Sequence, residues 1–425
     1  MKKTLVVAKL PQLFLLIFMI TEATSQSTFV PNYDETKVNH YTLPDLGDIT
    51  GKKITKVSEW EEAKVKWLQI YASKMYGIFP SKNLSVSSKL IVQKPVLNGH
   101  AEMKIWEVSL ASKVKVHLIG FIPHGKPVKV ALLGLNFCGI NTVFDDAEIP
   151  ISSKYVICNE NPFFNNHLAT EKAVGTQKET WQIEKVIKAG YATFSLSCAD
   201  FEEDFPEGFK KGVRTVLAND LNLKPEEWTA ISAWAWGLSK MLDVMKALPE
   251  LSDSKIILHG HSRMGKASLW AAANDNRFDA VIAIQSGEGG AALLRRNFGE
   301  GIEPITNRFP HWFLPDFAKY AGNESTLPMD QHILLSLIAP RPLFVTSAID
   351  DKWADPKGEF LSAKEAGFAY QLYGKNGISE ENMPDAEIPI GNFVNYYIRN
   401  GKHEVNALDW DYFLKFISKV DSGNF

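Results

Sequence analysis

Apolar and polar residues follow two different periods along the chain, and the change of period separates an N-terminal region from the rest. Apolar residues recur at helical spacing over residues 60–76, which predicts one amphipathic helix. Residues 84–135 alternate with a period of two, which predicts strands, mostly in antiparallel hairpins. After residue 185 the pattern changes again, to short apolar runs separated by helical stretches.

This last region alternates predicted strands and helices. The strands are expected over residues 189–197, 255–260, 280–285, 342–347 and 393–398, and the helices over residues 230–247, 266–273, 362–373 and 406–420. Such alternation is typical of an α/β fold whose mostly parallel sheet is covered by helices on both faces. Residues 136–185 and 288–335 are too long for ordinary connections, so we expect them to form substrate-facing loops.

The first 25 residues have the features of a secretory signal peptide. Lys2 and Lys3 precede an apolar run at residues 13–20, and small residues follow it. An uncleaved anchor is the alternative, but the run is shorter than the roughly 20 residues of a membrane span. We therefore expect a signal peptide at residues 1–25, a single domain at residues 26–425, and an exported protein, periplasmic or secreted, with no membrane attachment after cleavage.

Composition excludes several classes of function. The 425 residues are 45% hydrophobic and 22% charged, which indicates a globular protein with a large core. With 46 basic and 49 acidic residues, the net charge of −3 creates no basic field for nucleic acid. No zinc-site spacing, phosphate loop or dinucleotide fingerprint occurs, so we expect no metal and no cofactor. A monomer is expected.

The three cysteines are Cys138, Cys158 and Cys198, so at most one disulfide can form. A bridge between Cys138 and Cys158 would close a loop after one predicted strand. Equally, all three can be small buried hydrophobic residues. The sequence leaves this choice open.

The segment from Gly260 to Lys266, with the sequence GHSRMGK, joins a predicted strand to a predicted helix. A serine in such a turn, here Ser262, is typical of a nucleophile elbow. The usual elbow has glycines two residues on either side of the serine, whereas Gly265 lies three residues after it. The alternative is a serine that caps the helix of an ordinary strand-to-helix turn.

Chain order strengthens the catalytic interpretation. In an α/β-hydrolase the acid follows a later strand and the histidine lies near the C-terminus. Asp350 and Asp351 follow the strand at residues 342–347, and His403 follows the strand at residues 393–398. Singly, these are ordinary loop residues. Together with Ser262 they predict an α/β-hydrolase, a three-layer sandwich with antiparallel N-terminal strands, a mostly parallel central sheet and long substrate-facing loops.

Each residue type suits a step of acyl transfer. Ser262 becomes a nucleophile when His403 accepts its proton, and a carboxylate fixes the tautomer of His403 and stabilises its charged form. The N–H of Arg263 is a natural donor to the oxyanion, with a second donor expected from residues 136–139. The Arg263 guanidinium can stabilise the oxyanion or hold an anionic substrate group.

Taken in order, the motifs resemble those of the glucuronoyl esterases, especially the bacterial branch. The segments that carry the resemblance are residues 233–239, 260–266, 286–292, 307–313, 351–356 and 401–404. The resemblance implies a serine esterase that cleaves the ester between 4-O-methyl-glucuronic acid on glucuronoxylan and a lignin alcohol. The lignin–carbohydrate ester would then be the only expected partner.

The resemblance also implies roles for single residues. Ser262 matches the family's nucleophile, His403 its histidine and Arg263 its oxyanion-stabilising arginine. Lys266, Trp353 and Glu300 match residues that bind the uronic sugar; the alternatives are surface charges for Lys266 and Glu300 and core packing for Trp353.

The triad acid departs from the pattern of many relatives, which carry a glutamate directly before a Ser-Gly step. This chain has Gln285 there, and an amide cannot stabilise an imidazolium as a carboxylate does. Some bacterial relatives use an acid that matches Asp351. We therefore predict Asp351 as the acid, with Asp350 and Glu288 as alternatives.

Two other functions compete with this prediction. One is a different exported carbohydrate esterase, such as an acetyl or feruloyl esterase. An acetyl esterase has little use for the cations Arg263 and Lys266 beside its nucleophile. The other is a catalytically silent, carbohydrate-binding homologue, which the loss of the usual glutamate at Gln285 makes worth testing.

Overall fold

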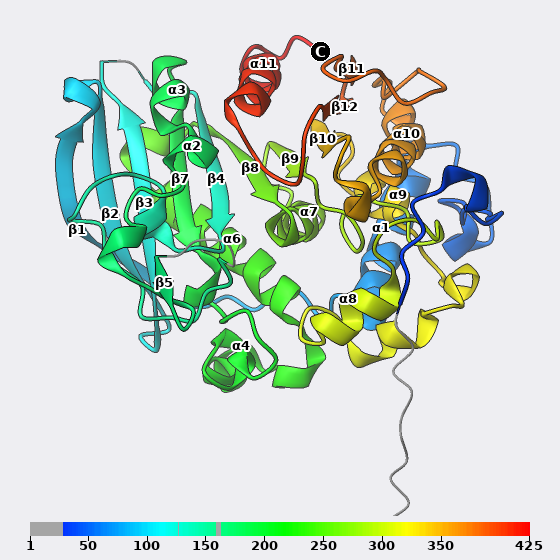
Figure 1. Ribbon diagram of the computed structural model, residues 1–425, viewed down its shortest axis with the longest axis horizontal. Coiled ribbons are helices and arrows are strands. Elements are labelled where there is room, and N and C mark those ends of the chain that lie inside the picture. The colour runs from blue at the N-terminus through cyan, green and yellow to red at the C-terminus, as the bar shows by residue number, and fades with distance from the viewer. Residues whose placement is uncertain (1–28, 126, 159–162) are drawn as a thin grey trace, which may run out of the picture. The chain divides into compact units, whose positions relative to one another are not determined.

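The computed structural model describes residues 29–125, 127–158 and 163–425, and residues Pro31–Phe425 form one compact unit. The predicted signal peptide at residues 1–25 lies outside the described residues. Within this unit the ten strands of the main sheet follow the order β1-β2-β3-β7-β4-β8-β9-β10-β12-β11 (Figure 1). The predicted α/β class, with antiparallel N-terminal strands and a mostly parallel remainder, is confirmed.

The N-terminal strands form the antiparallel end of the sheet. β1 (Val86–Val96), β2 (Ala101–Leu110) and β3 (Val114–Pro123) pair as hairpins, and β3 also pairs antiparallel with β7 (Ala192–Ser197). The last strand of this region, β4 (Val130–Asn136), belongs to no hairpin and pairs parallel with β7 and β8. All seven residues of β4 are buried, as expected for a strand covered on both faces.

The remaining parallel strands are β8 (Lys255–His261), β9 (Ala280–Ile284), β10 (Leu343–Ala348) and β12 (Val394–Arg399). The short β11 (Ile390–Gly391) closes the sheet in antiparallel orientation. Parallel strands that lie side by side place their carboxyl ends at one edge of the sheet. The loops after β8, β9, β10 and β12 therefore gather at the same edge.

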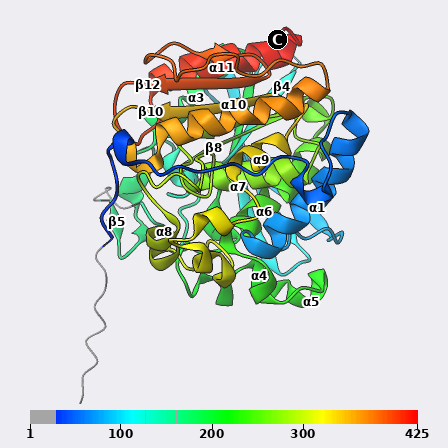
Figure 2. The same ribbon diagram turned by 90° about the vertical axis from the view of Figure 1, so that its right-hand side faces the viewer.

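Helices cover both faces of the sheet, and Figure 2 shows α10 and α11 on opposite sides of β12. Alternate residues of β4 serve the two layers: Ala131 and Leu133 belong to one hydrophobic cluster, and Val130 and Leu132 to the other. The first layer contains α1 (Val57–Lys74), α6 (Ala230–Ala247), α7 (Arg263–Asn274), α9 (Gln331–Ser336) and α10 (Pro356–Leu372), and the second contains α3 (Ile183–Lys188) and α11 (Ala407–Ser422).

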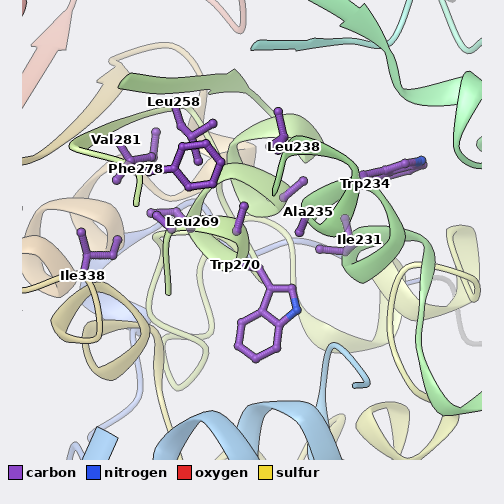
Figure 3. Packing of buried hydrophobic residues seen from close by; sticks show 14 of the residues in the cluster. Ile231, Trp234, Ala235, Leu238, Leu258, Leu269, Trp270, Phe278, Val281 and Ile338 are labelled. Carbon is purple, nitrogen blue, oxygen red and sulfur yellow. The ribbon is translucent and has the colours of Figure 1, made fainter. Parts of the chain in front are cut away.

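The centre of the larger cluster lies where α6 and α7 pack on the sheet. Figure 3 shows Ala235 and Leu238 of α6 beside Leu269 and Trp270 of α7, with Leu258 of β8 above Leu269. All five side chains are fully buried. This packing holds α7 firmly, and the N-terminus of α7 is where the candidate nucleophile lies.

Two helices begin earlier than the hydrophobic pattern predicts. α7 begins at Arg263 rather than residue 266, and α10 begins at Pro356 rather than residue 362. In α10 the cap explains the difference: Asp355 accepts a hydrogen bond from the N–H of Gly358, and a proline occupies the first turn. Capping residues are polar, so hydrophobic periodicity does not detect them.

The two long segments contain short elements rather than open loops. Residues 136–185 include β5 (Phe164–Asn165), β6 (Leu168–Ala169) and α2 (Lys178–Trp181), and residues 288–335 include α8 (Ile302–Arg308); α4 (Val213–Val216) and α5 (Ala218–Leu221) lie before α6. In the described part of the chain, no helix combines the length and apolarity needed to cross a membrane.

A disulfide joins Cys138 to Cys158 and settles the pairing that the sequence leaves open. Cys198 is buried and forms no disulfide.

We expect Cys158→Ser to lower the free energy of unfolding by about 2–4 kcal/mol. The bridge joins residues 20 positions apart and so reduces the number of conformations open to the unfolded chain. Urea unfolding under non-reducing conditions measures the loss. With a reductant present, both proteins should unfold alike; equal stability without reductant would contradict the prediction.

Candidate active site

Ser262 occupies a strained turn between β8 and α7. Its φ of 57° and ψ of −126° lie in a region that residues with a side chain rarely adopt, at a cost of about 1–3 kcal/mol. The Ser262 side chain makes no capping hydrogen bond to the helix. These features match a nucleophile elbow and not an ordinary capping serine.

The glycines around Ser262 allow the close approach of helix and strand. A Cβ atom on Gly260 would lie 2.2 Å from the carbonyl oxygen of Met264, and one on Gly265 would lie 2.9 Å from the carbonyl oxygen of Gly260. Gly265 therefore relieves the contact between the first turn of α7 and the end of β8. The unusual spacing of the second glycine is compatible with the elbow for this reason.

His403 and Asp351 face each other from the loops after β12 and β10. Nδ1 of His403 lies 2.6 Å from Oδ2 of Asp351, whose carboxylate is buried, whereas the imidazole is 41% exposed. This hydrogen bond leaves Nε2 as the ring nitrogen able to accept a proton from outside the pair. Of the alternative acids, Asp350 is exposed and Glu288 is buried; no hydrogen bond between either side chain and His403 occurs in the described residues.

Ser262 and His403 line one pocket of about 260 Å³. Its other lining residues include every predicted sugar-binding residue and the predicted acid: Arg263, Lys266, Gln285, Ser286, Gly287, Glu300, Arg308, Phe309, Trp312, Asp351, Trp353 and Ala354. Residues 288–335 thus contribute to this pocket, whereas no described residue of 136–185 lines it. Across the described residues, no cluster of His, Cys, Asp and Glu is arranged to hold a metal ion.

The Arg263 guanidinium is held on several sides. Its central carbon lies 5.2 Å from the ring centres of Phe137 and Trp312 and 5.7 Å from that of Phe309, which are favourable cation–π positions. Nη1 donates a hydrogen bond to the carboxylate of Asp204. The predicted donor loop at residues 136–139 thus reaches Arg263 through Phe137.

Lys266, Glu300 and Trp353 form one wall of the pocket. Lys266 is buried and donates to the carbonyl oxygen of Ser286; burial lowers its pKa, against the opposing charges of Glu300 and Glu288. Burial raises the pKa of Glu300, while Lys266 and a hydrogen bond from Trp353 act in the other direction. The N–H of Glu300 donates to the carbonyl oxygen of Trp353 at 2.8 Å. These side chains are therefore neither separate surface charges nor core packing.

Gln285 and Arg399 hold the loop that carries His403, a structural role that the sequence did not predict for either residue. Nε2 of Gln285 donates to the carbonyl oxygen of Glu404 at 2.9 Å, and Oε1 of Gln285 accepts from the N–H of Glu404 at 3.0 Å. Arg399 donates to the carbonyl oxygens of Asn400, Lys402 and Glu404 at 2.8, 2.8 and 2.6 Å. Gln285 therefore positions the residue next to His403. The departure from glutamate marked Gln285 in the sequence, but nothing marked Arg399.

Both the sequence and the fold of the chain are similar to those of known esterases. A family model described as glucuronyl esterase, fungi, matches residues 179–374. The chain is 37% identical over 393 residues to a carbohydrate esterase from an unknown prokaryotic organism, covering 91% of each chain. Among solved structures, a promiscuous esterase of carbohydrate esterase family 15 from a marine bacterial metagenome has a TM-score of 0.85 and 36% identity over 92% of this chain and 99% of that chain. The glucuronoyl esterase from Solibacter usitatus has a TM-score of 0.82 and 37% identity, over 91% of this chain and 100% of that chain.

Glu359 of α10 lies buried beneath the loops that follow β9 and β10. It accepts hydrogen bonds from Ser347 Oγ at 2.6 Å, the Gly287 N–H at 2.9 Å and Ser286 Oγ at 3.2 Å. Burial is the largest influence on this carboxyl group and raises its pKa to about 8. At neutral pH, Glu359 is therefore mainly protonated in the folded protein.

This raised pKa predicts a pH-dependent stability. Between about pH 4.5 and pH 8 the unfolded chain has lost the Glu359 proton and the folded protein retains it, so stability falls as pH rises. Glu359→Gln stays neutral throughout. Between pH 5 and pH 8 we expect the wild type to lose on the order of a few kcal/mol of unfolding free energy relative to Glu359→Gln, as measured by urea unfolding of both proteins. Parallel pH profiles would refute the prediction.

Proposed function

Because the chain belongs to the glucuronoyl esterase family of carboxylic ester hydrolases, we propose that it cleaves the ester between 4-O-methyl-glucuronic acid on glucuronoxylan and a lignin alcohol. The membership confirms the resemblance predicted from the motifs. One observation carries the proposal: Ser262, the His403–Asp351 pair and the cations Arg263 and Lys266 meet in a single pocket.

The proposed reaction proceeds through an acyl-enzyme. Ser262 Oγ attacks the ester carbonyl carbon while Nε2 of His403 takes the hydroxyl proton, and Asp351 stabilises the resulting imidazolium. When the tetrahedral intermediate collapses, His403 gives this proton to the departing alcohol oxygen. Water then attacks the acyl-enzyme, His403 takes its proton, and the same proton returns to Ser262 as glucuronic acid is released.

Charge on the tetrahedral intermediate is matched by donors at the start of α7. The first N–H groups of a helix have no partner within the helix, so the N–H of Arg263 is available to the oxyanion. The Arg263 guanidinium adds a permanent positive charge in the same pocket. Donors that are already in place stabilise the transition state without a cost of reorganisation.

Recognition of the sugar is assigned to Lys266, Glu300 and Trp353, which line the same pocket. Lys266 has three donor hydrogens, of which the bond to Ser286 uses one. Glu300 supplies acceptor oxygens for hydroxyl groups, and the half-buried Trp353 offers an apolar ring face to the pyranose. Both signs of charge and an aromatic surface suit a polar ring better than an acetyl group.

We also propose that the protein is exported, in the periplasm or outside the cell. The signal-peptide pattern at residues 1–25 supports this location. The Cys138–Cys158 disulfide supports it too, because such bonds form and persist mainly in oxidising compartments.

A broader carbohydrate esterase activity is the second candidate, since one similar structure is described as that of a promiscuous esterase. The two candidates differ in what the cations of the pocket do.

For each ester, kcat/KM can be divided by the rate constant of uncatalysed hydrolysis to give the acceleration. We expect this acceleration to be at least about 100-fold larger for benzyl glucuronate than for p-nitrophenyl acetate, because contacts to the uronate contribute roughly 3 kcal/mol. Equal acceleration of both esters would favour the broader enzyme. A protein that cleaves neither and resists labelling of Ser262 by a serine-directed phosphonate would be a silent homologue.

The identity of the acid can be tested with two matched substitutions. We expect Asp351→Asn to lower kcat for benzyl glucuronate about 10⁴-fold, because the amide disfavours the working tautomer and removes the charge that supports the imidazolium. Glu288→Gln removes another buried carboxylate near the pocket and should keep kcat within about threefold. An active Asp351→Asn variant together with an inactive Glu288→Gln variant would assign the acid to Glu288 instead.

A further inference from the structure

Asp204 is a fully buried carboxylate in the loop that follows β7, and it lines no part of the pocket. Three donors surround it. Oδ2 accepts from Nη1 of Arg263, and Oδ1 accepts from Nε2 of His311 at 2.8 Å and from Nε1 of Trp312 at 2.7 Å. Asp204 therefore joins the first residue of α7 to the segment that carries Trp312, itself a wall of the pocket.

The charge of Asp204 is retained by these contacts. Burial on its own raises the pKa of a carboxyl group, but the positive charge of Arg263 and the hydrogen bonds from His311 and Trp312 outweigh it and lower the pKa of Asp204. A buried anion of this kind is costly unless it is paired. Arg263, 59 residues away in the sequence, provides this pairing and so compensates the charge of Asp204.

An arginine without such an anchor is poorly suited to stabilise an oxyanion. Its long side chain has several rotatable bonds, and holding it in one conformation costs up to about 2 kcal/mol of entropy. The three rings around Arg263 restrict where the guanidinium lies, but cation–π contacts are weakly directional compared with a hydrogen bond. The bond to Asp204 fixes one nitrogen of the fork, and because the guanidinium is planar it fixes the directions of the others.

We propose that Asp204 is a positioning residue for catalysis: it holds Arg263 in the orientation that stabilises the oxyanion and keeps Trp312 against the same guanidinium. This inference rests on the proposed role of Arg263. It adds an essential side chain beyond the triad and Arg263, one that touches neither the substrate nor any member of the triad.

A neighbouring ion pair provides a matched control. Glu202, two residues before Asp204, is also fully buried and accepts from Nε and Nη2 of Arg214 at 2.7 and 2.6 Å. Arg214 also donates hydrogen bonds to the carbonyl oxygens of Pro225 and Trp228. None of these four residues lines the pocket, so Glu202 shares the burial and pairing of Asp204 without its link to Arg263.

The experiment is a double-mutant cycle with Asp204→Asn and Arg263→Ala, measured on benzyl glucuronate with kcat and KM determined separately. The amide introduced by Asp204→Asn can keep its oxygen toward Trp312 and His311, but its NH₂ group then faces the Arg263 donor and breaks that contact. We expect Asp204→Asn to lower kcat about 10- to 100-fold with KM changed less than about threefold, and Arg263→Ala to lower kcat about 100- to 1000-fold. The double variant should be no slower than Arg263→Ala.

The outcomes separate this inference from the proposed function. If the two reductions in kcat multiply in the double variant, Asp204 acts independently of Arg263 and the inference is wrong, while the role of Arg263 stands. If Arg263→Ala keeps the wild-type kcat, the proposed oxyanion role of Arg263 fails and the inference fails with it. Glu202→Gln should keep kcat within about twofold; a reduction as large as that of Asp204→Asn would mean that any buried charge in this loop affects activity, which also overturns the inference.

Circular dichroism and melting temperature establish that each variant is folded. Should Asp204→Asn fail to fold, Arg263→Lys tests the same link without removing a buried carboxylate. A lysine ammonium is a point charge and cannot both bond Asp204 and present a planar fork to the pocket. We expect its kcat to fall at least about tenfold. Wild-type kcat in Arg263→Lys would show that the anchored fork is unnecessary and would overturn the inference.

Discussion

The hydrogen bond between His403 and Asp351 depends on the register of two parallel strands. Ala348 at the end of β10 lies beside Arg399 at the end of β12, and the main-chain pairing continues past the strands, from the Ile349 N–H to Arg399 and from the Asp350 N–H to Gly401. Asp351 and His403 then follow within a few residues on the two loops. A shift of one residue in this register would turn the side chains to opposite faces and separate the acid from the histidine.

Ser262, the proposed nucleophile, is placed by the same kind of constraint. His261 at the end of β8 lies beside Ile284 at the end of β9, and the N–H of Ser262 donates to the carbonyl oxygen of Ile284 at 2.8 Å. Strain at Ser262 persists because the packing of α7 on the sheet leaves the turn no other conformation. The sheet thus sets the positions of Ser262, Asp351 and His403, the proposed catalytic residues, and the loops supply only the last few residues.

Two arginines around the pocket are paired with buried carboxylates. Arg263 is paired with Asp204, and Arg399 with Asp409 at 3.0 Å. Lys266 lies within the electrostatic influence of Glu300 and Glu288. Buried ion pairs are weak evidence for stability, since desolvation offsets much of their attraction. Here they hold particular side chains in one orientation, which is what a site acting through oriented donors and acceptors requires.

The order of chemistry-bearing residues along the chain was sufficient to predict the fold class and the positions of Ser262, Asp351 and His403, whereas the family and the pocket residues Lys266, Glu300 and Trp353 were predicted from the resemblance of the motifs. Ser262, Asp351 and His403 each follow a strand, and strand ends are visible as apolar runs that stop at polar residues. Local pattern was also enough for most strands, but it did not show that β4 pairs parallel with β7 and β8, and it started α7 and α10 too late. Pairing partners and polar caps do not alter hydrophobic periodicity.

Tertiary structure alone decided how the cysteines pair and what Gln285, Arg399 and Asp204 contact, and it brought the predicted acid Asp351 to His403. The hydrogen bonds from Arg399 to the loop of His403 reach one to five residues along the chain, but the contacts of the other residues join positions that lie from 20 to 119 residues apart. A side chain that works by holding another carries no motif of its own, because its partner is set by three-dimensional packing and not by spacing along the chain. The sequence by itself determined the chemistry available to this protein, and the fold determined how those groups are aimed.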